Sequence, residues 1–186
     1  EGVPVAIVGA PNAGKSSLLN YLIGEERAIV SNIPGTTRDV IEEVLTIEGI
    51  QFRLMDTAGI RETKEVIETL GIARSQEKIT RARIILLLSD SSDANQCILD
   101  REWVKELRLK HPNKIILWVA NKSDIGQSTE RVDHVISAIN GIGIEQLKQA
   151  MSAGIKKDFD ASQETIVSNV RHLEALQKTK LTFKTC

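Results

Sequence analysis

The sequence is poor in cysteine, in aromatic residues and in long apolar runs, and each shortage excludes a class of protein. Cys97 and Cys186 are the only two cysteines, far apart and outside any Cys-x-x-Cys spacing, which argues against a zinc site or a disulfide framework. Aromatic residues make up 3% of the chain, too few for a stacking array that binds single-stranded nucleic acid. No apolar run approaches the roughly 18 residues of a membrane span. A cytoplasmic protein without a membrane partner is therefore expected.

An excess of charge of one sign is also missing. Lys and Arg total 24 against 25 Asp and Glu, with no long block of either, so charge predicts neither a basic nucleic-acid face nor a membrane patch. The three histidines lie far apart without metal-ligand spacing, and we expect surface or helix-capping roles for them. The N-terminus lacks an initiator methionine and a charged signal region, which suggests an excised domain. The length of 186 residues suits one sizeable core.

Hydrophobic patterning predicts six strands with helices between most of them, at residues 3–8, 40–47, 51–55, 83–88, 115–120 and 131–137. Only residues 48–50 separate the second and third strands, so this pair is predicted to be antiparallel. The runs 84–88 and 115–119 are continuously apolar, as is typical of strands covered on both faces. The predicted fold is an α/β, doubly wound, mostly parallel six-stranded sheet with one antiparallel strand. Its ligand would bind beyond the carboxyl ends of the strands.

The strongest motif lies between the first predicted strand and the helix that follows it. Residues 9–16 read Gly-Ala-Pro-Asn-Ala-Gly-Lys-Ser, the pattern and context of a phosphate-binding loop. Its backbone N–H groups and the helix N-terminus would surround a polyphosphate. Lys15 would reach the β- and γ-phosphates, and the hydroxyl of Ser16 would bind Mg²⁺. The alternative is a glycine-rich turn without a ligand. The predicted nucleotide contacts here are Asn12, Ala13, Gly14, Lys15, Ser16 and Ser17.

Two further loops carry the groups that a bound nucleotide would need. Asp56 follows the third predicted strand and would contact Mg²⁺ through water, while the Gly59 N–H would meet the γ-phosphate. Residues 34–39 are polar and turn-prone, which would let Thr37 close over Mg²⁺ when a third phosphate is present. Taken alone, the Asp56 loop is more typical of an ordinary turn, and residues 34–39 fit a plain surface turn as well as a mobile loop. Their order along the chain supports the nucleotide interpretation.

The loop after the fifth predicted strand indicates which base is bound. The Asp124 carboxylate can accept hydrogen bonds from guanine N1–H and from the 2-amino group, whereas adenine would leave it unpaired. Asn121 would brace the neighbouring loops, and the stem of Lys122 would lie along the base. Ser137 and Ala138 would offer a backbone N–H to the guanine carbonyl oxygen. A solvated Asn-Lys-Ser-Asp turn is the alternative. GTP and GDP are the predicted ligands.

These motifs, in this order, resemble the translation-factor-related class of Ras-like P-loop GTPases over nearly the whole chain. Asn12 with residues 35–39 and 56–61 resembles the group that contains Era, Der and the MnmE (TrmE) family. Residues 60–75 and 168–176 resemble the second switch of the MnmE family and the helix by which its chain leaves the GTPase domain. The resemblance implies a GTPase domain at residues 1–160. It also implies a C-terminal helical segment at residues 161–186 that leads to a helical domain outside this sequence.

The resemblance to the MnmE family implies GTP hydrolysis coupled to modification of the tRNA wobble uridine (U34), with an MnmG-type partner acting through the full-length protein. That family's Cys-x-Gly-Lys ending is not found after Cys186, to which we assign no role. The alternative is a GTP-binding interaction module of the Era or Der kind that serves ribosome assembly. An RNA-binding domain or a second GTPase repeat would be expected in that case.

The catalytic groups are also implied by resemblance. Ile60 stands where many GTPases place a glutamine that orients the attacking water, and its side chain cannot form a hydrogen bond. The MnmE family implies Glu68 in that role, beside Lys15 and Thr37 as catalytic groups. A solvated helix glutamate is the alternative for Glu68.

An arginine finger is not evident, and the MnmE resemblance implies K⁺ in its place. The ligands would be Asn12 and the backbone carbonyls of Ser31 and Ile33, while Arg38 and Arg61 are competing sources of positive charge. The resemblance also implies a transient homodimer through the switch face. The magnesium ligands would be Ser16, Thr37 and Asp56.

Overall fold

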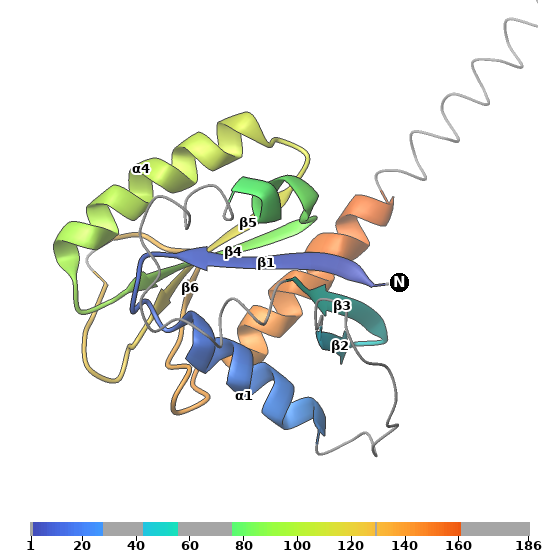
Figure 1. The fold of residues 1–186 in the computed structure, drawn as a ribbon, viewed down its shortest axis with the longest axis horizontal. Helices are drawn as coiled ribbons and strands as arrows, with labels where there is room; N and C mark the ends of the chain where they lie inside the picture. The colour runs from blue at the N-terminus through green and yellow to red at the C-terminus, as the bar shows by residue number, and fades with distance from the viewer. Residues whose placement is uncertain (1, 28–42, 56–75, 129, 161–186) are drawn as a thin grey trace, which may run out of the picture. The chain divides into compact units, whose positions relative to one another are not determined.

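The computed structural model describes residues 2–27, 43–55, 76–128 and 130–160 (Figure 1). The chain divides into two compact units, Glu1–Gln149 and Ala150–Cys186. Helical segments without a label in the figure cover residues 76–81 and 144–149 of the first unit and residues 150–160 of the second. The labelled elements, in chain order, are β1 (Val3–Gly9), α1 (Lys15–Arg27), β2 (Glu43–Ile47), β3 (Ile50–Leu54), β4 (Ile84–Asp90), α4 (Ala94–Lys110), β5 (Ile115–Asn121) and β6 (His134–Val135).

The strands form one six-stranded sheet in the order β2-β3-β1-β4-β5-β6. β2 pairs with β3 in the antiparallel direction and every other neighbouring pair is parallel, which confirms the predicted fold class. The turn between β2 and β3 contains two residues, one fewer than predicted. Glu48 and Gly49 both have positive φ, 49° and 79°, as a two-residue type I′ hairpin requires.

The sixth strand is shorter than the predicted residues 131–137. Only His134–Val135 pair with β5, and flanking bonds from Asp133 N to Trp118 O and from Ile136 N to Ala120 O extend the contact slightly. Ser137 then turns away from the sheet because its N–H and C=O both bond with Ile142, at 3.0 and 3.2 Å. The alternating pattern predicts a longer strand because the backbone bonds between Ser137 and Ile142 cannot be read from the residue types.

Helices cover both faces of the sheet, with α1 and α4 on opposite sides (Figure 1). Every residue from Ile84 to Ser89 is therefore buried, as the continuous apolar run predicts. Trp118 is buried in the core on the α4 side, and its Nε1 donates to Ser89 Oγ at 2.7 Å. His111 ends α4 as its C-cap, which confirms the capping role for one of the three histidines. That core comprises Ala6, Val8, Met55, Ile79, Ala82, Ile85, Leu87, Val104, Leu107, Ile116 and Trp118.

The parallel strands bring their following loops to one edge of the sheet. Gly9 at the end of β1 lies opposite Leu88, and Asp90 at the end of β4 lies opposite Asn121 at the end of β5. Ala120 lies opposite Val135 of β6. The loops after β1, β4, β5 and β6 therefore start side by side, at the edge where ligands of doubly wound sheets bind.

Candidate functional site

The loop after β1 has a backbone that only glycine can form at two positions. Gly9 and Gly14 have φ of 148° and 91°. A Cβ at Gly9 would lie 2.2 Å from Leu88 O, and one at Gly14 would lie 2.1 Å from Asn121 Nδ2. Asn12 also lies in the left-handed region, at φ 62°. The two glycines thus bring the loop against β4 and against the end of β5.

Lys15 folds back over this loop. Its Nζ donates to Gly9 O at 2.9 Å and to Ala10 O at 2.7 Å. Burial lowers the pKa of Lys15, and the nearby charge of Lys78 lowers that pKa further. A phosphate would give this partly desolvated ammonium a stronger, charge-assisted partner than two carbonyls. Lys15 also begins α1, whose N-terminus carries the positive end of the helix dipole.

Asn121 joins the phosphate loop to the loop after β6. Its Nδ2 donates to Ala13 O at 2.9 Å, and its Oδ1 accepts from Ala138 N at 3.0 Å. The residue is 2% exposed, so removing its amide would leave both backbone partners without a bond in a buried place. The Ala138 N–H, which we predict to face the guanine carbonyl, is directed at Asn121 in this structure.

The Asp124 carboxylate is oriented by the same loop. Ser137 Oγ donates to Asp124 Oδ1 at 2.6 Å, and Ser137 is fully buried. The turn after Ser137 packs against α1, since a Cβ at Gly141 would lie 2.2 Å from the hydroxyl of Tyr21. Asp124 therefore reaches this edge of the sheet from a braced loop, with its carboxylate tied to Ser137.

Lys122 has a partner that the sequence does not predict, the Asp90 carboxylate. Its Nζ lies 2.5 Å from Asp90 Oδ2, and Asp90 Oδ1 accepts from Ser92 N at 2.9 Å and from Ser92 Oγ at 2.6 Å. Burial acts to raise the pKa of Asp90, but the hydrogen bonds from Lys122 and Ser92 outweigh it, so the pKa is lowered overall. The sequence signal for this contact was a single carboxylate, Asp90, shortly after the apolar run 84–88.

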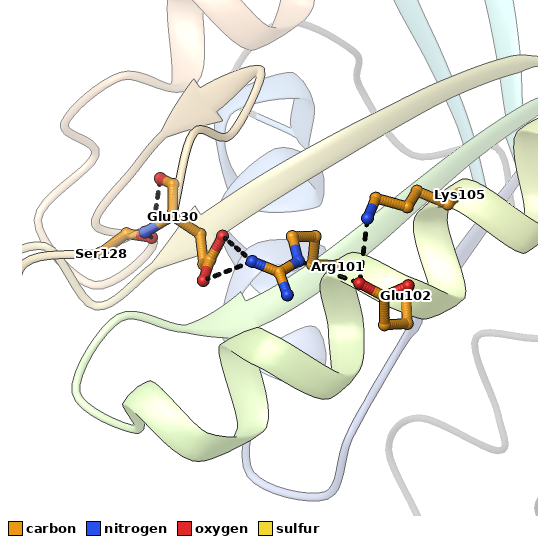
Figure 2. Close-up of polar contacts among 5 residues, drawn as sticks. All are labelled: Arg101, Glu102, Lys105, Ser128 and Glu130. Atoms are coloured by element: carbon orange, nitrogen blue, oxygen red, sulfur yellow. Dashed lines mark hydrogen bonds and ion pairs between the residues drawn. The ribbon is translucent and has the colours of Figure 1, made fainter.

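Ion pairs on the surface tie the loop between β5 and β6 to α4 (Figure 2). Arg101 Nη1 lies 3.3 Å from Glu130 Oε2, and Arg101 also pairs with Glu102, which Lys105 contacts at 3.0 Å. Ser128 Oγ accepts from the Glu130 N–H at 3.2 Å. Because Arg101, Glu102 and Lys105 are largely exposed, solvent screens these pairs and each adds little to stability.

The structure thus brings together residues 9–17, Asn121, Lys122, Asp124 and the Ser137–Ala138 loop. The predicted switch residues lie outside the described residues, and their roles stay predictions. They are Ser31, Ile33, Thr37, Arg38, Asp56, Gly59, Ile60, Arg61 and Glu68. The predicted C-terminal segment at residues 161–186, which includes Cys186, also lies outside the described residues.

Each predicted cofactor has one predicted ligand within the described residues. The hydroxyl of Ser16 and the side-chain oxygen of Asn12 are hard donors of the type that Mg²⁺ and K⁺ prefer, so the residues present fit these ions. Within residues 2–27, 43–55, 76–128 and 130–160, no three His, Cys, Asp or Glu side chains gather as a metal site. Over the same part of the chain, no helix combines the length and apolar character needed to cross a membrane.

Comparison with known sequences gives a consistent set of relatives. Residues 4–122 match the family described as 50S ribosome-binding GTPase. The tRNA modification GTPase MnmE of Christiangramia forsetii is 43% identical over 96% of this chain and 42% of its own length. The MnmE proteins of Flavobacterium johnsoniae and Chlorobium chlorochromatii are 44% and 46% identical over 96% of this chain. The chain spans about two fifths of the length of these relatives.

Solved structures share the fold. The G domain of the Thermotoga maritima FeoB iron transporter superposes with a TM-score of 0.57 at 26% identity, covering 82% of this chain and 98% of that one. Era in complex with MgGDPNP and a segment of 16S ribosomal RNA superposes with a TM-score of 0.55 at 31% identity, covering 81% of this chain and 56% of that one.

Proposed function

The chain belongs to the 50S ribosome-binding GTPase family as a GTP-binding G domain of the MnmE type, and we propose that its GTPase activity serves modification of the tRNA wobble uridine (U34) within a longer protein. The observation that carries the proposal is the match to tRNA modification GTPases over 96% of the chain at 43% identity. An MnmG-type protein and tRNA would be partners of the full-length protein.

Each described loop has a part in nucleotide binding under this proposal. The loop of residues 9–14 and the N-terminus of α1 would bind the phosphates, with Lys15 turning from its carbonyl partners to the β- and γ-phosphates. Asp124, oriented by Ser137, would accept the two N–H donors of guanine. Asn121 would hold the two loops at the correct spacing.

For hydrolysis, Ser16 would bind Mg²⁺ with Thr37 and Asp56, and Asn12 would bind K⁺ with the carbonyls of Ser31 and Ile33. Bound K⁺ would supply positive charge where charge develops in the transition state. Glu68 would polarise the attacking water, which Ile60 cannot orient. These roles are carried by resemblance, because only Ser16 and Asn12 lie in the described part of the chain.

K⁺ and dimer formation are predicted to act together. With GDP and aluminium fluoride, the chain is expected to sediment as a dimer in KCl and as a monomer in NaCl of matched ionic strength. GTP turnover should be about tenfold faster in KCl, because a cage of oxygens spaced for unhydrated K⁺ fits Na⁺ poorly. Analytical ultracentrifugation and phosphate release measure the two effects. Equal turnover in both salts, or a monomer in both, would contradict this part of the proposal.

The second candidate is a GTP-dependent interaction module for ribosome assembly, favoured by the structural similarity to Era. Deleting the parent gene in its host separates the two. We expect U34 of the relevant tRNAs to lose its modification, measured by nucleoside mass spectrometry, and to regain it when the gene is restored. Fully modified tRNA together with accumulating precursor ribosomal subunits would instead support the second candidate.

A further inference from the structure

Lys122 is held in an unusual conformation beside the nucleotide site. Its φ is 66°, in the left-handed region that residues with a Cβ rarely adopt. The C=O of Lys122 accepts from the N–H groups of Ile125 and Gly126, which closes the loop after it. Its side chain, 25% exposed, ends on Asp90, whose side chain is 18% exposed. The far end of this lysine is thus fixed by a second element of the fold.

Asp90 is itself well anchored. It ends β4 opposite Asn121 of β5, and the next N–H, from Ser91, donates to Asn121 O at 2.9 Å. The C=O of Asp90 accepts from Asp93 N at 3.1 Å and from the buried Sγ of Cys97 at 3.2 Å. With both Ser92 bonds on Oδ1, the other carboxylate oxygen is directed at Lys122. Asp90 is a rigid acceptor built from the β4 end and the α4 N-terminus.

We propose that Asp90 is a positioning residue for guanine-nucleotide binding, which holds the Lys122 ammonium so that the stem of Lys122 is already in place to receive the base. This inference rests on the proposed nucleotide site. Asp90 touches neither base nor phosphate in this account. Asp90 acts through Lys122, which lies 32 positions later in the chain. The end of β4 therefore influences the affinity for the nucleotide through the loop after β5.

The physical reason is conformational entropy. A lysine side chain free in solvent samples many rotamers, and part of that conformational entropy is lost when a ligand immobilises it. A side chain that is ordered before binding avoids that loss, which raises affinity without a new contact. The pair is mostly covered, so solvent screens it less than the exposed pairs of α4.

Asp90→Asn is the test variant. The asparagine can still accept from Ser92, but its amide group replaces the oxygen that faces Lys122, so the ion pair is lost. We expect GDP to bind roughly three- to tenfold more weakly, from the cost of ordering one freed side chain. Inorganic tripolyphosphate, which has no base to contact Lys122, is expected to bind as tightly as before. Calorimetric titration measures both affinities.

Two controls separate positioning from general damage. Asp93→Asn changes the neighbouring carboxylate, which caps α4 by accepting from Gln96 N, and asparagine caps a helix equally well, so both affinities should stay unchanged. In a Lys122→Met background, Asp90→Asn should have no further effect on GDP binding. A GDP affinity within twofold of the unaltered chain for Asp90→Asn, an equal loss for tripolyphosphate, or additive effects in the double variant would each overturn the proposal. Failure of the unaltered chain to bind GDP would overturn the nucleotide site itself.

Discussion

Asp124→Asn is expected to weaken GDP and GTP binding by about 10²- to 10⁴-fold, because two charge-assisted hydrogen bonds of about 1.5–3 kcal/mol each are lost. The same variant is expected to bind xanthosine diphosphate, whose carbonyl replaces the 2-amino group of guanine. The asparagine amide can donate to that carbonyl while its oxygen accepts from the N1–H. The base preference therefore reverses rather than disappears.

The Ser137 contact makes this reversal specific. Ser137 Oγ donates to Asp124 Oδ1 at 2.6 Å, and an asparagine whose oxygen keeps that bond must direct its NH₂ group to the other carboxylate position. Competition titrations with GDP and xanthosine diphosphate on one sample measure the preference, so the two nucleotides control for loss of folded protein. Unchanged preference for GDP, or equal loss of both ligands, would remove Asp124 from the base site.

Asn121→Ala is expected to have the second largest effect. It leaves Ala13 O and Ala138 N without partners in a buried place, at a cost of about 1–3 kcal/mol for each group. We expect the melting temperature to fall by roughly 5–20 °C, from the shift of about 2–4 °C per kcal/mol in a chain of this size. GDP affinity should fall by about 10²-fold, because the phosphate loop and the loop after β6 lose their common anchor.

Asn95→Ala is the matched control, since Asn95 is exposed on α4 and remote from these contacts in sequence. It should leave the melting temperature and the GDP affinity unchanged. Differential scanning calorimetry and nucleotide titration give the two readings for both variants. If Asn121→Ala behaved like Asn95→Ala, the bracing role of Asn121 would be wrong.

The sequence predicted the elements that depend on local pattern. The strand positions, the antiparallel pair and the phosphate loop follow from apolar runs, short spacing and the glycine positions, all of which are visible within a few residues. The length of β6 could not be predicted in this way. It depends on Ser137, whose backbone N–H and C=O bond with Ile142 and whose hydroxyl donates to Asp124.

Contacts between residues that lie far apart in the chain were the other limit on what the sequence could predict. Asn121 was predicted to brace neighbouring loops, but its bond to Ala13 joins residues 108 positions apart, and no sequence spacing identifies that carbonyl. Asp90 received no role because a single carboxylate after a strand is indistinguishable from a turn residue until the fold places it against Lys122. The chemistry of a site is readable from residue types, whereas its supporting contacts require the topology.

Calorimetric titration of the unaltered chain with GDP and with ADP, both with Mg²⁺, tests most directly whether the loops after β1, β5 and β6 form one guanine-nucleotide site. We expect one GDP bound per chain and an affinity for ADP at least about 10⁴-fold weaker, since adenine leaves the Asp124 carboxylate unpaired. Equal affinity for the two nucleotides, or no heat of binding for either, would contradict the account.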